Sequence, residues 1–166
     1  MLELLKTVGA LSGLFAAGFL VWDRYSKHFP AVTIVAQPLS PGSQNITHRL
    51  RVKNVSERPI LVSWSNINPA PTQLLLAKDH SFRGIMDPLY IGPTVIALGP
   101  EQEVFLPLLS INNYGDIDPD NILTTALRWR FAQPIIWNAD RTLRVTIRKR
   151  DYDDMIDNYV STTEDQ

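Results

Sequence analysis

Residues 46–65, ITHRLRVKNVSERPILVSWS, carry the clearest structural signal in this chain. Through residues 46–53 apolar or aromatic side chains alternate with charged or polar ones, which is the period of a half-buried β-strand. Residues 54–59 are rich in turn formers and include a proline. The alternation resumes over residues 60–64, so this stretch predicts two strands joined as a β-hairpin.

The same alternation recurs outward from this stretch. Residues 94–98 and 103–108 flank Gly99-Pro100-Glu101-Gln102, which predicts a second hairpin. Further strands are predicted at residues 32–36, 72–77, 123–131 and 143–147. No helical period long enough for a βαβ crossover separates them, so the fold class is all-β: an antiparallel sandwich of about seven strands.

The predicted order of strands resembles immunoglobulin-like domains, although the chain lacks the cysteine pair of that family. The resemblance is one of architecture. Trp64 and Trp129 are expected to be the large core residues, each burying on the order of 200 Å². The resemblance implies no particular activity. An immunoglobulin-like β-sandwich is therefore expected over residues 31–150.

The N-terminal segment differs from the rest of the chain. The 16 residues from Thr7 to Trp22 are uncharged and apolar on every side. At 1.5 Å per residue they span about 24 Å, close to the ~30 Å hydrocarbon core of a bilayer. We therefore expect one transmembrane helix within a membrane anchor and juxtamembrane segment at residues 1–30. A cleaved signal peptide and a soluble helix are the alternatives.

Small residues recur along this segment at Gly9, Gly13 and Ala17, a spacing that lets membrane helices approach closely. The stripe indicates a homodimer or a partner membrane protein, but such residues are also common in membrane helices generally. Lys6 on one side and Arg24 and Lys27 on the other do not fix the orientation. A single-pass location in the cell membrane is expected, with the side of the β domain open.

Charge is unevenly distributed behind a formal net charge of −1. Residues 1–30 carry +1 and residues 31–150 carry +4, whereas residues 151–166 hold six acidic side chains and no Lys or Arg. The last segment is predicted to be a polar tail that frays after Met155 or Tyr159. Cysteine is absent, which excludes disulfides and thiolate metal sites.

Asp116, Asp118 and Asp120 alternate in a predicted loop, as acidic residues do at the start of a calcium loop. The pattern then departs from that motif, because Asn121 replaces its glycine and Leu127 its final glutamate. A solvated turn is the simpler interpretation. The three histidines, His28, His48 and His80, have no metal-ligand spacing, and His48 is expected as a hydrogen-bonded core residue.

Basic side chains alternate with apolar ones on the predicted strands. They are Arg49, Arg51, Lys53, Arg128, Arg130, Arg144, Arg148 and Arg150. If their strands share one sheet, these cations form one basic face that contacts anionic lipid or an acidic protein surface. The alternative is a solvated outer face neutralised by the acidic tail. Nucleic acid is disfavoured, because no aromatic residues are interleaved.

The function predicted from these features is binding, by a single-pass membrane protein that presents a small β-sandwich. No cofactor and no enzymatic activity are expected, since the chain shows no phosphate loop and no grouped catalytic residues. A structural accessory subunit of a membrane complex is the first alternative. A calcium-dependent binder or enzyme that uses the loop Asp116–Asp120 is the second.

Overall fold

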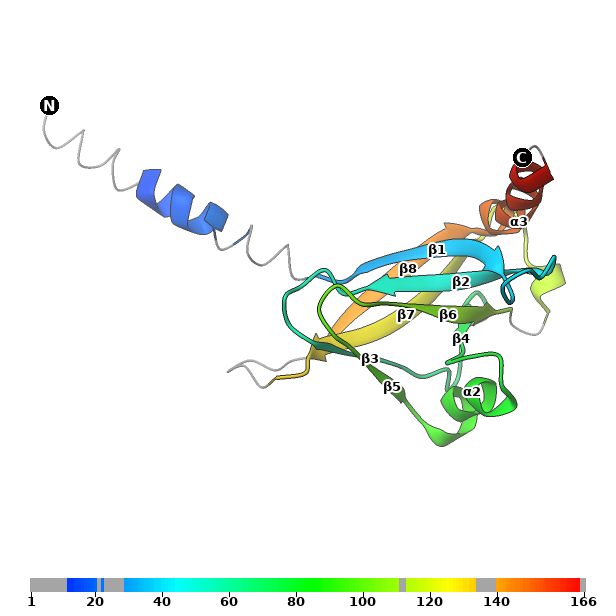
Figure 1. Cartoon of the computed structure of the whole chain (residues 1–166), viewed down its shortest axis with the longest axis horizontal. Coiled ribbons are helices and arrows are strands. Elements are labelled where there is room, and N and C mark those ends of the chain that lie inside the picture. The colour runs from blue at the N-terminus through cyan, green and yellow to red at the C-terminus, as the bar shows by residue number, and fades with distance from the viewer. Residues whose placement is uncertain (1–11, 21, 23–28, 111–112, 134–139, 165–166) are drawn as a thin grey trace, which may run out of the picture.

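The chain folds as two packed antiparallel sheets of four strands each, which confirms the predicted β-sandwich (Figure 1). The structure is a computed structural model that describes residues 12–20, 22, 29–110, 113–133 and 140–164. The strands are β1 (Ala31–Pro38), β2 (Ile46–Lys53), β3 (Ile60–Trp64), β4 (Leu75–Leu76), β5 (Thr94–Leu98), β6 (Glu103–Leu109), β7 (Ile122–Phe131) and β8 (Arg141–Arg148). One sheet has the order β1-β2-β6-β4 and the other β5-β3-β7-β8.

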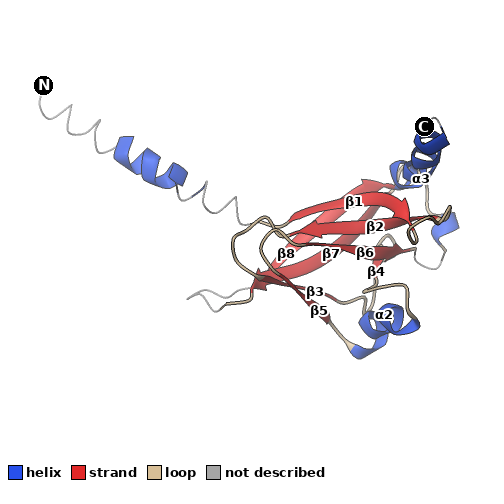
Figure 2. Cartoon of the chain, in the orientation of Figure 1, coloured by secondary structure: helices blue, strands red, loops and turns tan. Residues whose placement is uncertain are grey.

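Few helices accompany the strands in the described part of the β domain (Figure 2). The α-helix α2 (Phe82–Met86) and the π-helix η1 (Asp87–Ile91) lie between β4 and β5. A 3-10 turn, η2 (Tyr114–Asp116), precedes β7, and α3 (Lys149–Glu164) follows β8.

Alternating apolar residues turn one face of each sheet toward a shared core. In β2 the inward residues are His48, Leu50 and Val52, and in β7 they include Leu127 and Trp129, the latter 1% exposed. Trp64 is 3% exposed, so both predicted core tryptophans are buried. The sandwich therefore has outer faces formed by the intervening polar side chains.

Both predicted hairpins are wrong, because their strands belong to different sheets. β2 pairs with β1 and β6, whereas β3 pairs with β5 and β7. β5 and β6 are likewise divided between the two sheets. Residues 54–59 and 99–102 thus cross from one sheet to the other. The chain does form hairpin neighbours at β1–β2 and β7–β8.

A buried asparagine fastens these two crossings together. The Asn54 side-chain amide donates to the carbonyl oxygens of Arg58 at 2.8 Å and Gly99 at 2.9 Å, and its backbone N–H donates to Gln102 O at 2.9 Å. Its side-chain oxygen, Oδ1, accepts from Ser56 Oγ at 2.7 Å. Asn54 is fully buried, so these bonds satisfy backbone groups that water does not reach.

The strand predicted at residues 72–77 is also divided between the sheets. Gln73 forms an isolated bridge to Thr124 of β7, whereas Leu75 and Leu76 pair with β6 as the short strand β4. The segment therefore closes one end of the sandwich by passing from one sheet to the other.

The acidic C-terminal segment is helical through Glu164 instead of fraying earlier. Tyr152 is 2% exposed and stacks on the imidazole of His48, with ring centroids 3.6 Å apart. This apolar contact holds the first turns of α3 against the sandwich, although most other residues of the helix are polar.

Residues 12–20 and 22 are helical, and Leu14, Phe15 and Phe19 on this stretch are exposed. Within the described ranges, no helix combines the length and the apolar character needed to cross a bilayer. Part of the predicted span from Thr7 to Trp22, including Gly9, lies outside the described residues. Gly13 and Ala17 lie on the helix that is described, with no heavy atom within 4 Å of a Cβ built at Gly13.

Candidate binding groove

The predicted basic residues are divided among three places, because their strands do not share a sheet. Arg49, Arg51 and Lys53 of β2 alternate with buried residues and so lie on the outer side of the β1-β2-β6-β4 sheet. The four arginines on β7 and β8 (Arg128, Arg130, Arg144 and Arg148) lie on the outer side of the other sheet. Arg150 belongs to α3. A single face of eight cations is therefore absent.

Acceptors within the chain already engage the three cations of β2. Arg51 forms an ion pair with Glu103 at 2.7 Å, and Lys53 forms one with Glu101 at 2.9 Å. Arg49 donates to the backbone oxygen of Leu39 at 2.8 Å. Arg51 and Lys53 therefore have acidic partners, whereas Arg49 donates to backbone oxygens.

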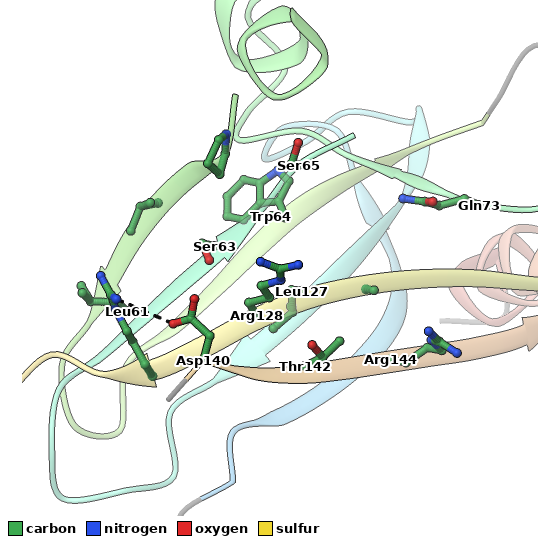
Figure 3. Close-up of a pocket in the computed structure, with 14 residues that line it drawn as sticks. Leu61, Ser63, Trp64, Ser65, Gln73, Leu127, Arg128, Asp140, Thr142 and Arg144 are labelled. Carbon is green, nitrogen blue, oxygen red and sulfur yellow. Dashed lines mark ion pairs between the residues drawn. The ribbon is translucent and has the colours of Figure 1, made fainter. Parts of the chain in front are cut away.

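The outer side of the β5-β3-β7-β8 sheet is hollowed into a groove of about 620 Å³ (Figure 3). Short side chains from three neighbouring strands contribute to its lining, with Ser63 from β3, Ala126 from β7 and Thr142 from β8. Larger side chains, among them Leu61 and Arg128, line it as well. The lining therefore combines short and long side chains on adjacent strands.

Arg128, Arg130 and Arg144 line this groove, and we call them the groove arginines. In the sheet, Arg128 pairs with Ser63 on one side and Thr142 on the other, and Figure 3 shows Arg128 on β7 and Arg144 on the neighbouring strand β8. Residues two apart on a strand are about 7 Å apart on the same face. The groove therefore presents closely spaced positive charges over a polar floor.

Two of the groove arginines have no carboxylate partner among the residues that the structure describes. Arg130 lies 3.7 Å from Asp140, which is the one acidic residue of the described lining. Arg128 and Arg144 make no ion pair with any described residue, and both are exposed. A guanidinium stays charged at all ordinary pH values and binds carboxylates through two parallel hydrogen bonds. The groove can thus bind an anion but offers no grouped acid–base residues.

Arg148 and Arg150 do not line the groove. Arg148 lies opposite Ile122 at the far end of β8, and the described residues give it no ion pair. Arg150 contacts Asp120 at 3.5 Å and Asp151 at 3.6 Å, so neighbouring acids neutralise it. Of these two acids, only Asp151 belongs to the acidic C-terminal segment.

The aspartates of the candidate calcium loop are engaged elsewhere. Asp118 accepts the backbone N–H of Asp120 at 2.8 Å, as in an ordinary turn, and Asp120 faces Arg150. Throughout the residues that the structure describes, no three His, Asp or Glu side chains converge as metal ligands. The loop therefore supplies contacts to α3, and Asp116 lies in the adjoining 3-10 turn.

A second polar cluster joins α3 to the sandwich. His48 is 8% exposed and its Nε2 donates to the backbone oxygen of Tyr152 at 2.5 Å, so the expected core histidine is confirmed. Burial lowers the pKa of His48, while the bond to Tyr152 and the charge of Asp153 oppose that shift. Tyr114 donates its hydroxyl to Asp153 at 2.5 Å. His28 lies outside the described residues, and His80 is exposed.

The sequence analysis missed an exposed apolar surface on α2 and η1. Phe82 is 77% exposed, and Tyr90 and Ile91 are each 80% exposed. A signal was present, because Phe82, Met86 and Tyr90 recur every four residues and so share one side of a helix. Gln73, which also lines the groove, gave no such signal.

Comparisons with known proteins found no relative from which a function could be inferred. The chain matched no family model, no curated protein and no solved structure.

Proposed function

We propose that this chain is a membrane-tethered binding protein whose groove arginines hold an acidic segment of a partner protein. The observation that carries the proposal is the pair of exposed arginines, Arg128 and Arg144, which face a hollow without an ion-pair partner among the described residues. Like charges held close together are unfavourable alone, and a bound carboxylate relieves that repulsion.

The shape of the site favours a polypeptide segment over a lipid surface. A bilayer is flat over the width of a small domain, so headgroups reach a concave floor poorly, whereas an extended chain enters a groove. Side chains on one side of an extended chain also repeat about every 7 Å. That repeat equals the expected spacing of Arg128 and Arg130 on β7.

The β domain is further proposed to be immunoglobulin-like. The strand order supports this. The sheet β1-β2-β6-β4 corresponds to the immunoglobulin strand order A-B-E-D, and the sheet β5-β3-β7-β8 corresponds to the order C′-C-F-G. One feature departs from that family, because β4 precedes β5 in the chain whereas strand C′ precedes strand D. Immunoglobulin-like sandwiches commonly act by binding, which agrees with the proposal by analogy of fold.

The anchor proposal rests on the uncharged run Thr7 to Trp22. Alkaline carbonate extraction tests it: the full chain is expected to remain in the membrane pellet, and a chain that begins at Phe29 to be released. Release of the full chain would contradict the anchor. The stripe of Gly9, Gly13 and Ala17 remains a candidate for pairing within the membrane.

The binding proposal is tested with the full chain in mild detergent and a fluorescent peptide of four Glu-Ser repeats. Fluorescence polarisation is expected to show saturable binding that weakens with added salt, because the arginines are exposed. The double substitution Arg128→Gln/Arg144→Gln is expected to lower the affinity at least tenfold, which is about 1.4 kcal/mol.

The matched control is Arg51→Gln/Lys53→Gln, which removes the same net charge from the opposite sheet. It is expected to leave the affinity within about twofold, because these cations already pair with glutamates. Equal losses in the two double variants would mean that overall charge, and no particular groove, attracts the peptide. Displacement of the peptide by phosphatidylserine nanodiscs, but not by phosphatidylcholine nanodiscs, would favour a lipid ligand instead.

A further inference from the structure

The apolar side chains of α2 and η1 are exposed although their backbone is firmly held. Ser81 caps α2 by accepting the N–H of Gly84 at 3.0 Å, and Lys78 N–H donates to Gly84 O at 3.0 Å. Asn66 N–H donates to Pro88 O at 2.9 Å, which ties η1 to the end of β3. The exposure of Phe82 is therefore a property of a packed, hydrogen-bonded segment.

Gly84 shows how closely this segment packs. A Cβ at this position would lie 2.9 Å from the backbone nitrogen of Asp79 and would overlap the Asp79 side chain. The helix thus approaches the chain that follows β4 as closely as glycine permits. The outward side chains Phe82, Met86, Tyr90 and Ile91 form what we call the apolar face.

The apolar face is connected to the groove through a second hollow, whose lining also includes charged side chains. Pro93 lines both the groove and a neighbouring hollow of about 450 Å³. Arg83, Asp87 and Ile91 line both that hollow and the apolar face. In Figure 1, α2 lies beyond the start of β5, and the shared lining residues connect the groove on that sheet to the apolar face.

We propose that one extended segment of a partner protein covers this whole surface, with acidic residues at alternate positions on the groove arginines and an aromatic or aliphatic residue beyond them on the apolar face. The inference rests on the proposed function and adds the partner's chemistry. Charge complementarity assigns the acidic part, because Arg128 and Arg144 are unpaired among the described residues. The shared lining residues connect the groove to the apolar face, so the apolar residue is assigned to the same partner segment as the acidic residues.

The size of the surface fits such a segment. From Leu61, which lies opposite Arg130, to Ser65 at the end of the groove is five residues of extended backbone, or roughly 14 Å. That length corresponds to about five residues of an extended partner, so a segment that continues to the apolar face is longer than five residues. Exposed Tyr, Phe and Arg side chains are also the types enriched where protein interfaces contribute most.

The test compares two fluorescent peptides on the full chain in mild detergent. One has four Glu-Ser repeats; the other has the same repeats flanked at both ends by Gly-Phe-Leu, so that the direction of binding does not matter. The flanked peptide is expected to bind at least tenfold more tightly. Phe82→Ser/Tyr90→Ser is expected to remove this gain and to leave binding of the unflanked peptide within about twofold.

Leu39→Ser/Val55→Ser is the matched control, since it removes two exposed apolar side chains away from the groove. It is expected to keep the tenfold difference. Equal binding of the two peptides by the unmodified chain would overturn the inference while leaving the proposed function intact. Binding of neither peptide would overturn both. Self-association in sedimentation that Phe82→Ser/Tyr90→Ser abolishes would assign the face to a second copy and overturn the inference.

Discussion

Thr125 places a hydroxyl inside the core, where no described residue forms a hydrogen bond with it. The residue is 1% exposed, and its Oγ1 has no partner among the described residues. A buried polar group without a partner costs about 1–3 kcal/mol. Valine has nearly the same shape and no hydroxyl, and it suits a strand at least as well.

Thr125→Val is therefore expected to raise the free energy of unfolding by about 1 kcal/mol in urea titration. Thr146→Val on the exposed side of β8 is the control and is expected to change it by less than about 0.5 kcal/mol. A loss of stability in Thr125→Val would show that the hydroxyl has a partner, such as a buried water.

His48 couples the stability of the fold to pH. Burial lowers its pKa below the ordinary 6.5, and the charged group facing it is Asp153, while the ring of Tyr152 stacks on it. The unfolded chain therefore binds a proton at a higher pH than the folded chain does. The stability that His48 contributes is therefore present above about pH 6.5, and it is lost as the pH falls toward the pKa of the folded state.

Urea unfolding at about pH 7.5 and about pH 5.5 should thus show a larger loss in the unmodified chain than in His48→Gln. The comparison with His48→Gln cancels the titration of every other group, including His80. An equal loss in both chains would mean that His48 keeps an ordinary pKa when folded.

At the scale of elements, the sequence predicts which residues form strands far better than which strands pair. The limits of β2 agree with the prediction, and β7 and β8 fall where alternation placed them. Alternation reports the face on which a side chain lies, and both sheets turn apolar residues to the same core. Alternation therefore could not distinguish a hairpin turn at residues 54–59 from a crossing between sheets. The crossing depends on side-chain hydrogen bonds of Asn54, one of which goes to the distant residue Gly99.

The helix α3 also required information that local sequence does not hold. Its acidic composition resembles a solvated tail, and its attachment depends on Tyr152 meeting His48, which is 104 residues away. A single buried aromatic ring can fix a polar helix that would not be stable alone. The apolar face was detectable from its four-residue period, whereas the groove depends on strand pairing.

Tyr152→Ala is expected to lower the free energy of unfolding by about 3 kcal/mol or more, as for other buried aromatic residues. Loss of circular dichroism from α3 should accompany the change. Tyr90→Ala is the matched control, because Tyr90 is 80% exposed, and it should alter stability by less than about 0.5 kcal/mol. Similar effects of the two substitutions would contradict the docking of α3 through Tyr152.

For the whole molecule, the fold converts one predicted set of cations into surfaces of different character. Arg51 and Lys53 of β2 pair with glutamates and Arg150 pairs with aspartates, whereas Arg128 and Arg144 line a groove without an ion pair among the described residues. The sequence identified the residue types and their outward direction. It did not separate them, because the division follows from the order β1-β2-β6-β4 and β5-β3-β7-β8.

Photo-crosslinking is the measurement that locates the binding site most directly. A peptide of four Glu-Ser repeats with a diazirine side chain at its centre is bound to the full chain, irradiated, and mapped by mass spectrometry. Crosslinks are predicted on the outer side of the β5-β3-β7-β8 sheet, at residues such as Ser63, Val95 and Ala126. They should disappear with excess unlabelled peptide. Crosslinks concentrated on β2 and β6, or spread evenly over the exposed surface, would contradict the groove as the binding site.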